Sequence, residues 1–181
     1  HGGIGFSTVN AALRREVCLV PQLPALIDEF VTAARNAIAA GFDGVELHAA
    51  NGYLLNQFLA SNTNLRTDGY GTSLHGRIRF VVEVVEAVAA AIGAARTAIR
   101  VSPGHMFNDL VDANPLETHR ALLDALPTAD MAYVHVMLPD AFSTQLNNAG
   151  DSQAVLPTLR PHVKGALIAA GNLTAASAAT M

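Results

Sequence analysis

Residues 25–48 read ALIDEFVTAARNAIAAGFDGVELH, and this stretch decides the fold class. Over residues 25–40, apolar side chains recur at the i, i+3, i+4 spacing of an amphipathic helix. Gly41 follows, and glycine is common just after the end of a helix. Next comes GFDGVELH, which places Val45 and Leu47 on one face of a short strand. A helix that leads directly into a buried strand is the repeating unit of parallel α/β proteins.

The same alternation continues along the rest of the chain. The apolar pattern predicts further helices over residues 77–92, 116–126 and from Leu173 onward. It predicts strands over residues 98–103, 131–137 and 165–172. Residues 139–153 are polar and are predicted to form a loop. The order βαβαβ(α)βα indicates a parallel sheet covered by helices. A doubly wound sheet and a (β/α)8 barrel both fit this order.

Two nucleotide-binding motifs are missing, since no GxGxxG follows the first strand and no GxxxxGK[ST] occurs. A complete (β/α)8 barrel needs about 250 residues. Four strands in 181 residues would make about half of one, as a single partial-barrel domain over residues 1–181. The chain begins at His1 rather than Met and stops at Met181 within an alanine-rich run, so we expect a portion of a longer polypeptide.

Composition restricts the class of protein. With 51% hydrophobic and 14% charged residues, the chain can bury a core, which excludes a disordered protein. A net charge of -4 argues against a nucleic-acid partner. Cys18 is the single cysteine, so no internal disulfide or CxxC site is expected. No apolar run reaches the roughly 18 residues of a membrane span and no signal peptide is visible, so the expected location is cytoplasmic.

In parallel α/β proteins, functional side chains gather at the carboxyl ends of the strands. The first strand end carries His48, Asn51 and Tyr53. An imidazole and an amide can both donate hydrogen bonds to one oxygen and so polarise a carbonyl group. The phenol of Tyr53 could then supply a proton as a general acid. In the alternative interpretation, which spacing alone favours, the first two residues cap a loop and the tyrosine packs.

Two other strand ends carry candidate residues. Arg100 lies in an otherwise apolar strand, so it must face a ligand or pair with a carboxylate such as Glu46 on the preceding strand. Gly171 and Asn172 end the last strand before a helix, where a backbone N–H can approach a phosphate. An ordinary left-handed turn suits the same dipeptide and is the favoured interpretation without other support. The histidine spacing predicts no metal site, and no GxSxG motif indicates a hydrolase.

A longer ordered pattern joins these positions. The chain reads HAANGYLLNQFL at residues 48–59, RTDGYG at 66–71 and IRVSP at 99–103. These motifs resemble the old yellow enzyme family, whose members are FMN-dependent ene-reductases built on a (β/α)8 barrel. Weaker similarity continues through YVHV and AAGN, so that the resemblance runs from about residue 21 to 175. Residues 1–20 are poorly matched.

The resemblance implies a role for each residue of the first strand end. His48 and Asn51 match the family's pair that holds the carbonyl oxygen of the substrate. Tyr53 matches the tyrosine that protonates the alkene. The small-molecule substrate is therefore expected to be an activated, enone-like alkene.

The resemblance also implies a cofactor site. Arg100 matches the arginine that faces the flavin ring, while Gly171 and Asn172 match a turn that contacts the FMN phosphate. The implied activity is that of an enzyme, an oxidoreductase that passes hydride from NADPH or NADH through FMN to a C=C bond.

The chain departs from the family pattern in two ways. The family usually reads RTDEYGGSIENRARF, whereas this chain reads RTDGYGTSLHGRIRF, with changes at Gly69, Thr72, His75 and Gly76. The family's first three strands and its eighth strand, which also contact the flavin, have no counterpart. The alternative is therefore a non-catalytic or truncated half-barrel that assembles through exposed strand edges, and a homo-oligomer remains an open expectation.

Overall fold

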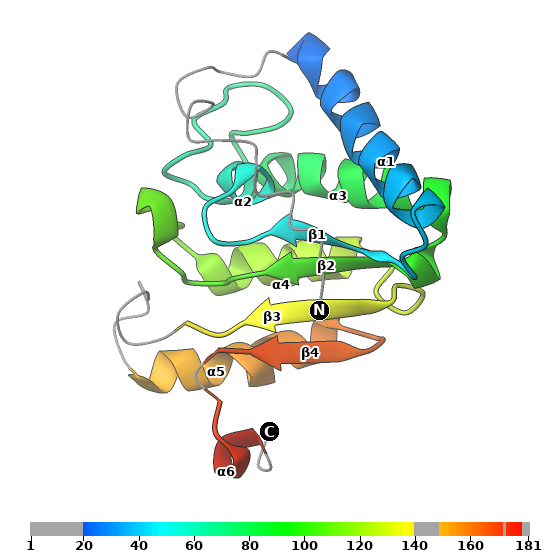
Figure 1. Ribbon diagram of the computed structural model, residues 1–181. Helices are drawn as coiled ribbons and strands as arrows, with labels where there is room; N and C mark the ends of the chain where they lie inside the picture. The colour runs from blue at the N-terminus through cyan, green and yellow to red at the C-terminus, as the bar shows by residue number, and fades with distance from the viewer. Residues whose placement is uncertain (1–19, 140–148, 172, 179–181) are drawn as a thin grey trace.

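The computed structural model describes residues 20–139, 149–171 and 173–178. The predictions on Cys18, on Asn172 and on residues 140–148 of the polar loop lie outside these residues. Within them, the chain alternates between parallel strands and helices (Figure 1). The main elements are α1 (Leu23–Ala39), β1 (Val45–Ala49), α2 (Leu54–Leu59), α3 (Leu74–Ile92), β2 (Thr97–Val101), α4 (Pro115–Ala125), β3 (Tyr133–Met137), α5 (Ala149–Leu159), β4 (Leu167–Ala170) and α6 (Ala175–Ala178).

The order of the strands decides between the two architectures that the sequence left open. All neighbouring pairs are parallel, and the strands lie side by side in chain order, β1-β2-β3-β4 (Figure 1). In a doubly wound sheet the order reverses at a switch point, whereas here it does not. Right-handed crossovers then bring successive helices to one face, where α1 packs on α3, α3 on α4 and α4 on α5. The described residues therefore form a four-stranded part of a (β/α)8 barrel.

The hydrophobic core lies between the sheet and this helix layer. Leu47, Ile99 and Val134 point into it from successive strands and are 0% exposed. Helix α3 contributes the centre of the core, with Phe80 and Val84 also fully buried. Burying a side chain of this size stabilises the fold by about 1.5–3 kcal/mol, so this layer holds the strands in register.

Local signals explain where the helices begin and end. Ser73 precedes α3, and its side-chain oxygen accepts a hydrogen bond from the backbone N–H of Gly76 at 3.0 Å. Gly41 and Gly93 follow α1 and α3 with φ of 93° and 95°, which few other residues adopt. No helix among the described residues is long and apolar enough to cross a membrane.

Two expectations about local structure were wrong. The sequence pattern predicts no helix between residues 48 and 77, yet α2 lies there, and it is too short to show helical periodicity in the sequence. Residues 149–153 belong to α5 and not to a polar loop. This helix is held at its other end, where Val155, Leu156 and Leu159 are buried, so tertiary packing outweighs the polar character of its first turns.

Candidate active site

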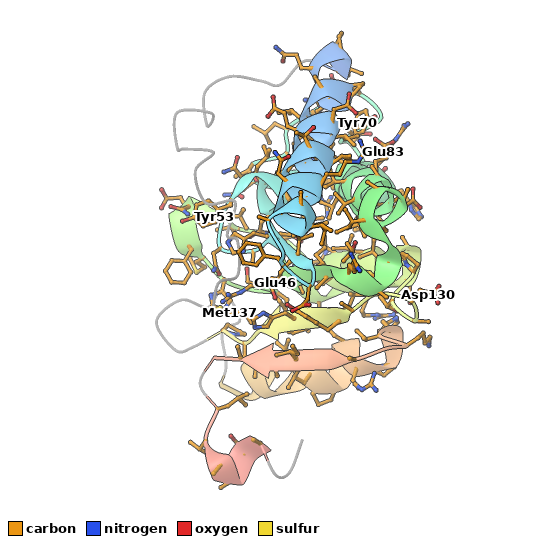
Figure 2. All side chains as sticks on the ribbon, turned by 45° about the vertical axis from the view of Figure 1, so that its right-hand side comes forward. Glu46, Tyr53, Tyr70, Glu83, Asp130 and Met137 are labelled. Carbon is orange, nitrogen blue, oxygen red and sulfur yellow. The ribbon has the colours of Figure 1, made fainter. Side chains whose placement is uncertain are left out.

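The face of the sheet opposite the helices, called the inner face below, carries the polar side chains of the strands. Because side chains alternate along a strand, these are the residues between the core positions (Figure 2 labels two of them, Glu46 and Met137). They are Glu46, His48, Arg100, Tyr133, His135 and Met137. Tyr70 and Glu83, by contrast, lie near α1, away from this face (Figure 2).

At the carboxyl end of β1, the structure brings His48 and Tyr53 into contact. His48 is the register partner of Arg100 on β2. The rings of His48 and Tyr53 lie with their centroids 5.0 Å apart at an angle of 49°. No described residue forms a hydrogen bond to the Tyr53 hydroxyl.

The charge state of His48 follows from its surroundings. Burial lowers the pKa of His48, and the positive charge of Arg100 lowers it further, against the opposing effect of Glu46. The imidazole is therefore neutral at pH 7 and keeps one N–H with which it can donate a hydrogen bond.

Asn51 lies in a sharp turn directly after β1. Its φ is 55° and that of Gly52 is 76°, so two successive residues adopt left-handed backbone. The side-chain oxygen of Asn51 is buried, and no described residue bonds to it. Buried polar atoms nearly always have a partner, so this orphaned oxygen marks a place where a bound molecule or water is expected.

Arg100 does not form the ion pair with Glu46 that the sequence suggested as an alternative. The carboxylate of Glu46 instead lies 2.9 Å from Nδ1 of His135, two strands away. One guanidinium nitrogen of Arg100 lies 2.6 Å from the sulfur of Met137. Its Nε is buried, and no described residue accepts a hydrogen bond from it. This arginine therefore retains a charge and an unused donor on the inner face.

Glu46 and its neighbours form a small charged network beside Arg100. Burial raises the pKa of Glu46, but His135, Tyr133 and Arg100 together outweigh it and lower the pKa below its ordinary value. The pKa of Tyr133 is raised, first by burial and then by the carboxylate. Sequence reasoning overlooked Tyr133 and Met137, although stepping by two residues from His135 would have found both.

Gly171 lies at the end of β4, at the same edge of the sheet as the other candidates. Its φ is 93°, and a Cβ at this position would lie 2.7 Å from the carbonyl oxygen of Leu138. Only glycine therefore fits, which agrees with the left-handed turn predicted there. Its partner in the predicted phosphate turn, Asn172, lies outside the described residues.

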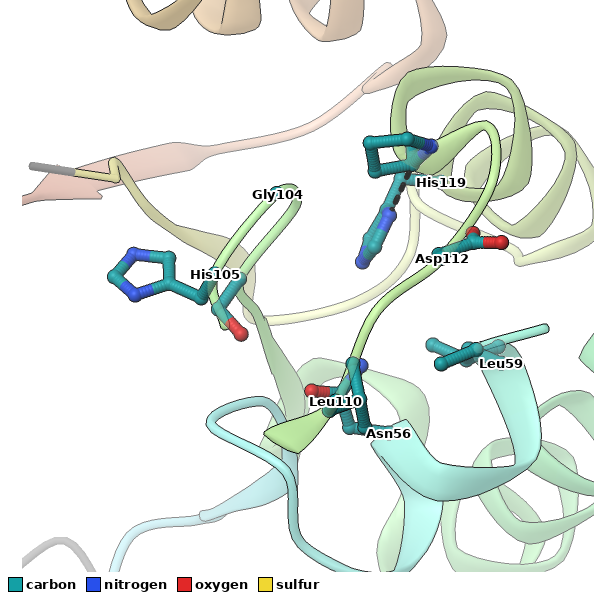
Figure 3. Close-up of a pocket in the computed structure, with 10 residues that line it drawn as sticks. Asn56, Leu59, Gly104, His105, Leu110, Asp112 and His119 are labelled. Carbon is teal, nitrogen blue, oxygen red and sulfur yellow. Dashed lines mark hydrogen bonds between the residues drawn. The ribbon is translucent and has the colours of Figure 1, made fainter. Parts of the chain in front are cut away.

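A small pocket lies beside the Asn51 turn, between the loop after β2, α2 and α4 (Figure 3). His119 lines it, and its Nδ1 lies 2.7 Å from the carbonyl oxygen of Pro115. The pocket has room for about one water molecule, so it cannot hold an organic substrate. Across the described ranges, no group of three or more His, Cys, Asp or Glu side chains could hold a metal ion.

Comparison with known proteins identifies what this arrangement resembles. A family model described as the NADH:flavin oxidoreductase / NADH oxidase family matches residues 21–181. Putative 12-oxophytodienoate reductase 5 of Oryza sativa subsp. japonica is 44% identical, over 84% of this chain and 40% of its own. A probable flavin mononucleotide-dependent alkene reductase of Leishmania infantum is 47% identical, over 67% of this chain and 33% of its own.

Solved structures give the same picture. Morphinone reductase superposes with a TM-score of 0.82 at 37% identity, covering 91% of this chain and 43% of that protein. An old yellow enzyme homologue from Zymomonas mobilis superposes with a TM-score of 0.77 at 33% identity, covering 90% of this chain and 45% of that protein. The chain thus spans less than half the length of each of these proteins.

Proposed function

Since the chain belongs to the NADH:flavin oxidoreductase / NADH oxidase family, that of the old yellow enzymes, we propose that it carries the substrate-activating residues of an FMN-dependent alkene reductase. The proposed reaction reduces the activated C=C bond of an enone-like substrate with NADPH or NADH. One observation carries the proposal. At the carboxyl end of β1, His48 is the register partner of Arg100, and its ring lies against that of Tyr53.

The residues present fit the flavin that this reaction needs. The unused Nε of Arg100 gives a buried cation for the electron-rich edge of the ring. At Gly171 a Cβ would meet the carbonyl oxygen of Leu138, so only glycine fits the turn that we assign to the phosphate, and Asn172 is the second residue of that assignment. FMN, when bound, supplies the hydride that it takes from the nicotinamide.

The protein's own residues activate the substrate and deliver the proton. The neutral imidazole of His48 and the amide of Asn51 donate hydrogen bonds to the carbonyl oxygen, which stabilises the negative charge that forms there. The hydroxyl of Tyr53 gives its proton to the α-carbon while the β-carbon receives hydride. Solvent then returns a proton to the tyrosinate, so the phenol is regenerated.

The alternative of a non-catalytic half-barrel is not favoured, because the relatives that match this segment are themselves described as reductases. A cytoplasmic location and a small-molecule alkene substrate remain part of this proposal.

The test uses the full-length protein that contains this sequence. We expect the purified protein to show visible flavin absorbance, to lose it with NADPH under anaerobic conditions and to regain it with 2-cyclohexen-1-one. Tyr53→Phe should slow reoxidation by the enone about a hundredfold and leave reduction by NADPH unchanged, since general acids contribute 10²–10⁴-fold. A colourless protein that takes up no added FMN would contradict the proposal.

A further inference from the structure

Two side chains that follow β2 hold the backbone of Asn51 from the neighbouring loop. We propose that Ser102 and Asn108 are positioning residues, which orient the Asn51 carboxamide toward the carbonyl oxygen of the substrate. This inference rests on the proposed function, in which that carboxamide binds the enone.

Both backbone polar groups of Asn51 are bonded to these side chains. The N–H of Asn51 donates to Oγ of Ser102 at 2.8 Å. The amide nitrogen Nδ2 of Asn108 donates to the carbonyl oxygen of Asn51 at 2.9 Å. In the chain, Ser102 is 51 residues from Asn51 and Asn108 is 57 residues from it. Both contacts are therefore tertiary rather than local.

The backbone of Asn51 needs such support because of its conformation. Left-handed backbone is uncommon for a residue with a Cβ, even though asparagine tolerates it better than most. Gly52, the second left-handed residue, is held locally by the first turns of α2. Its N–H donates to Oδ1 of Asn56 at 3.0 Å, and its carbonyl oxygen accepts from Nε2 of Gln57 at 2.7 Å. Asn51 has no such local partner and depends on the loop after β2.

The loop after β2 is itself pinned to the Asn51 segment. Asn108 and Asp109 have φ of 60° and 58°. The side chain of Asn62 donates to the carbonyl oxygen of Asp109 at 2.8 Å and accepts from the N–H of Val111 at 2.8 Å. A Cβ at Gly52 would lie 2.6 Å from the carbonyl oxygen of Phe107, so loop and turn are in direct contact. Because Asn62 holds the loop that carries Asn108, the matched control lies elsewhere. Thr128 is 3% exposed, and its Oγ1 accepts a hydrogen bond from the N–H of Lys164 at 3.1 Å, so Thr128→Ala removes a bond of the same kind outside this loop.

Burial sets the order of the expected effects. Ser102 is 2% exposed, so removing its hydroxyl leaves the N–H of Asn51 without a partner in a buried place. The hydrogen bond from Asn108 to Asn51 is exposed to solvent, so in Asn108→Ala a water molecule can take the place of the missing side-chain amide. Ser102→Ala should therefore have a larger effect than Asn108→Ala, and Thr128→Ala should have the smallest.

The first measurement is steady-state kinetics on the full-length, FMN-loaded protein. We expect Ser102→Ala to raise the KM for 2-cyclohexen-1-one about tenfold or more, because small misplacements of positioning groups are costly. Asn108→Ala should raise KM less, and Ser102→Thr should restore the KM of the natural protein. The flavin content of these variants should match that of Thr128→Ala. Equal KM values for all three alanine variants would overturn the proposal. If Ser102→Ala does not fold, the exposed Asn108→Ala variant decides.

The second measurement does not depend on activity. Hydrogen exchange of the Asn51 amide should be about tenfold faster in Ser102→Ala than in the natural protein and unchanged in Thr128→Ala. Unchanged exchange in Ser102→Ala would overturn the inference. If the natural protein reduces no enone, the proposed function fails, and this measurement still decides whether Ser102 holds Asn51.

Discussion

The carboxylate of Glu46 lies 2.9 Å from Nδ1 of His135, across the intervening strand β2. This bond joins the first and third strands on the inner face. Among the described residues, it leaves the guanidinium of Arg100, on the strand between them, without a carboxylate partner. The charge of Arg100 is thereby kept available, because the nearby carboxylate of Glu46 is bonded to His135 instead.

A first prediction concerns the stability that this bond provides. Glu46→Gln should lower the free energy of unfolding by about 1.5–3 kcal/mol, the range for hydrogen bonds to charged groups. The matched control is Asp124→Asn, which removes the charge from a contact with His162 at 2.6 Å in which the acid side chain is 59% exposed. That loss should stay below about 1 kcal/mol. Urea unfolding measures both, and equal losses would contradict the prediction.

The pH dependence of stability gives a second prediction, carried by His119. This residue is 3% exposed, and burial lowers its pKa despite the bond to the carbonyl of Pro115. In the unfolded chain the pKa of a histidine is about 6.5, and above this pH the imidazole is neutral in both states. As the pH falls below about 6.5, the unfolded state binds the proton first, so the free energy of unfolding decreases until the pH has passed the lower pKa of the folded state. Melting temperature should therefore drop below pH 6.5, and less steeply in His119→Gln. An unchanged slope in the variant would rule out His119 as the cause.

A third prediction concerns backbone strain in the segment that departs from the family pattern. Thr72 has φ of 57°, a conformation that is rare for a β-branched residue, where the family usually has glycine. Thr72→Gly should stabilise the protein by about 1 kcal/mol. Gly93→Ala is the converse control, since φ is 95° and a Cβ there would meet no atom within 4 Å. Gly93→Ala should destabilise the protein by a similar amount. Thermal unfolding measures both variants, and a change in stability of the same sign in the two would contradict this account.

A fourth prediction tests the proposed cofactor contact. Arg100→Lys keeps the charge but removes the planar guanidinium and its unused Nε. The affinity of the full-length apoprotein for FMN should fall about tenfold, which corresponds to about 1.4 kcal/mol. Arg79→Lys, on an exposed helical ion pair with Glu83, should leave it unchanged. Quenching of FMN fluorescence measures both, and equal affinities would remove Arg100 from the proposed site.

Much of the fold could be predicted from the sequence. The alternation around Leu47 predicted β1, and the apolar stripe through Phe80 and Val84 predicted α3, both within a few residues of the observed bounds. The family motifs also led to His48 and Tyr53, whose rings the structure places together. Their roles, like those of Asn51, Arg100 and Gly171, stay predictions until the experiments above are done.

Local patterns were sufficient for these features because a helix or strand imposes its own periodicity on the residues within it. The sequence by itself therefore determined the type and order of most elements and the residues that end the strands. Only the tertiary structure decided that the strands lie in chain order, that His135 rather than Arg100 pairs with Glu46, and that Ser102 and Asn108 hold Asn51. Each of these depends on contacts between residues that are far apart in the chain, which no local periodicity encodes.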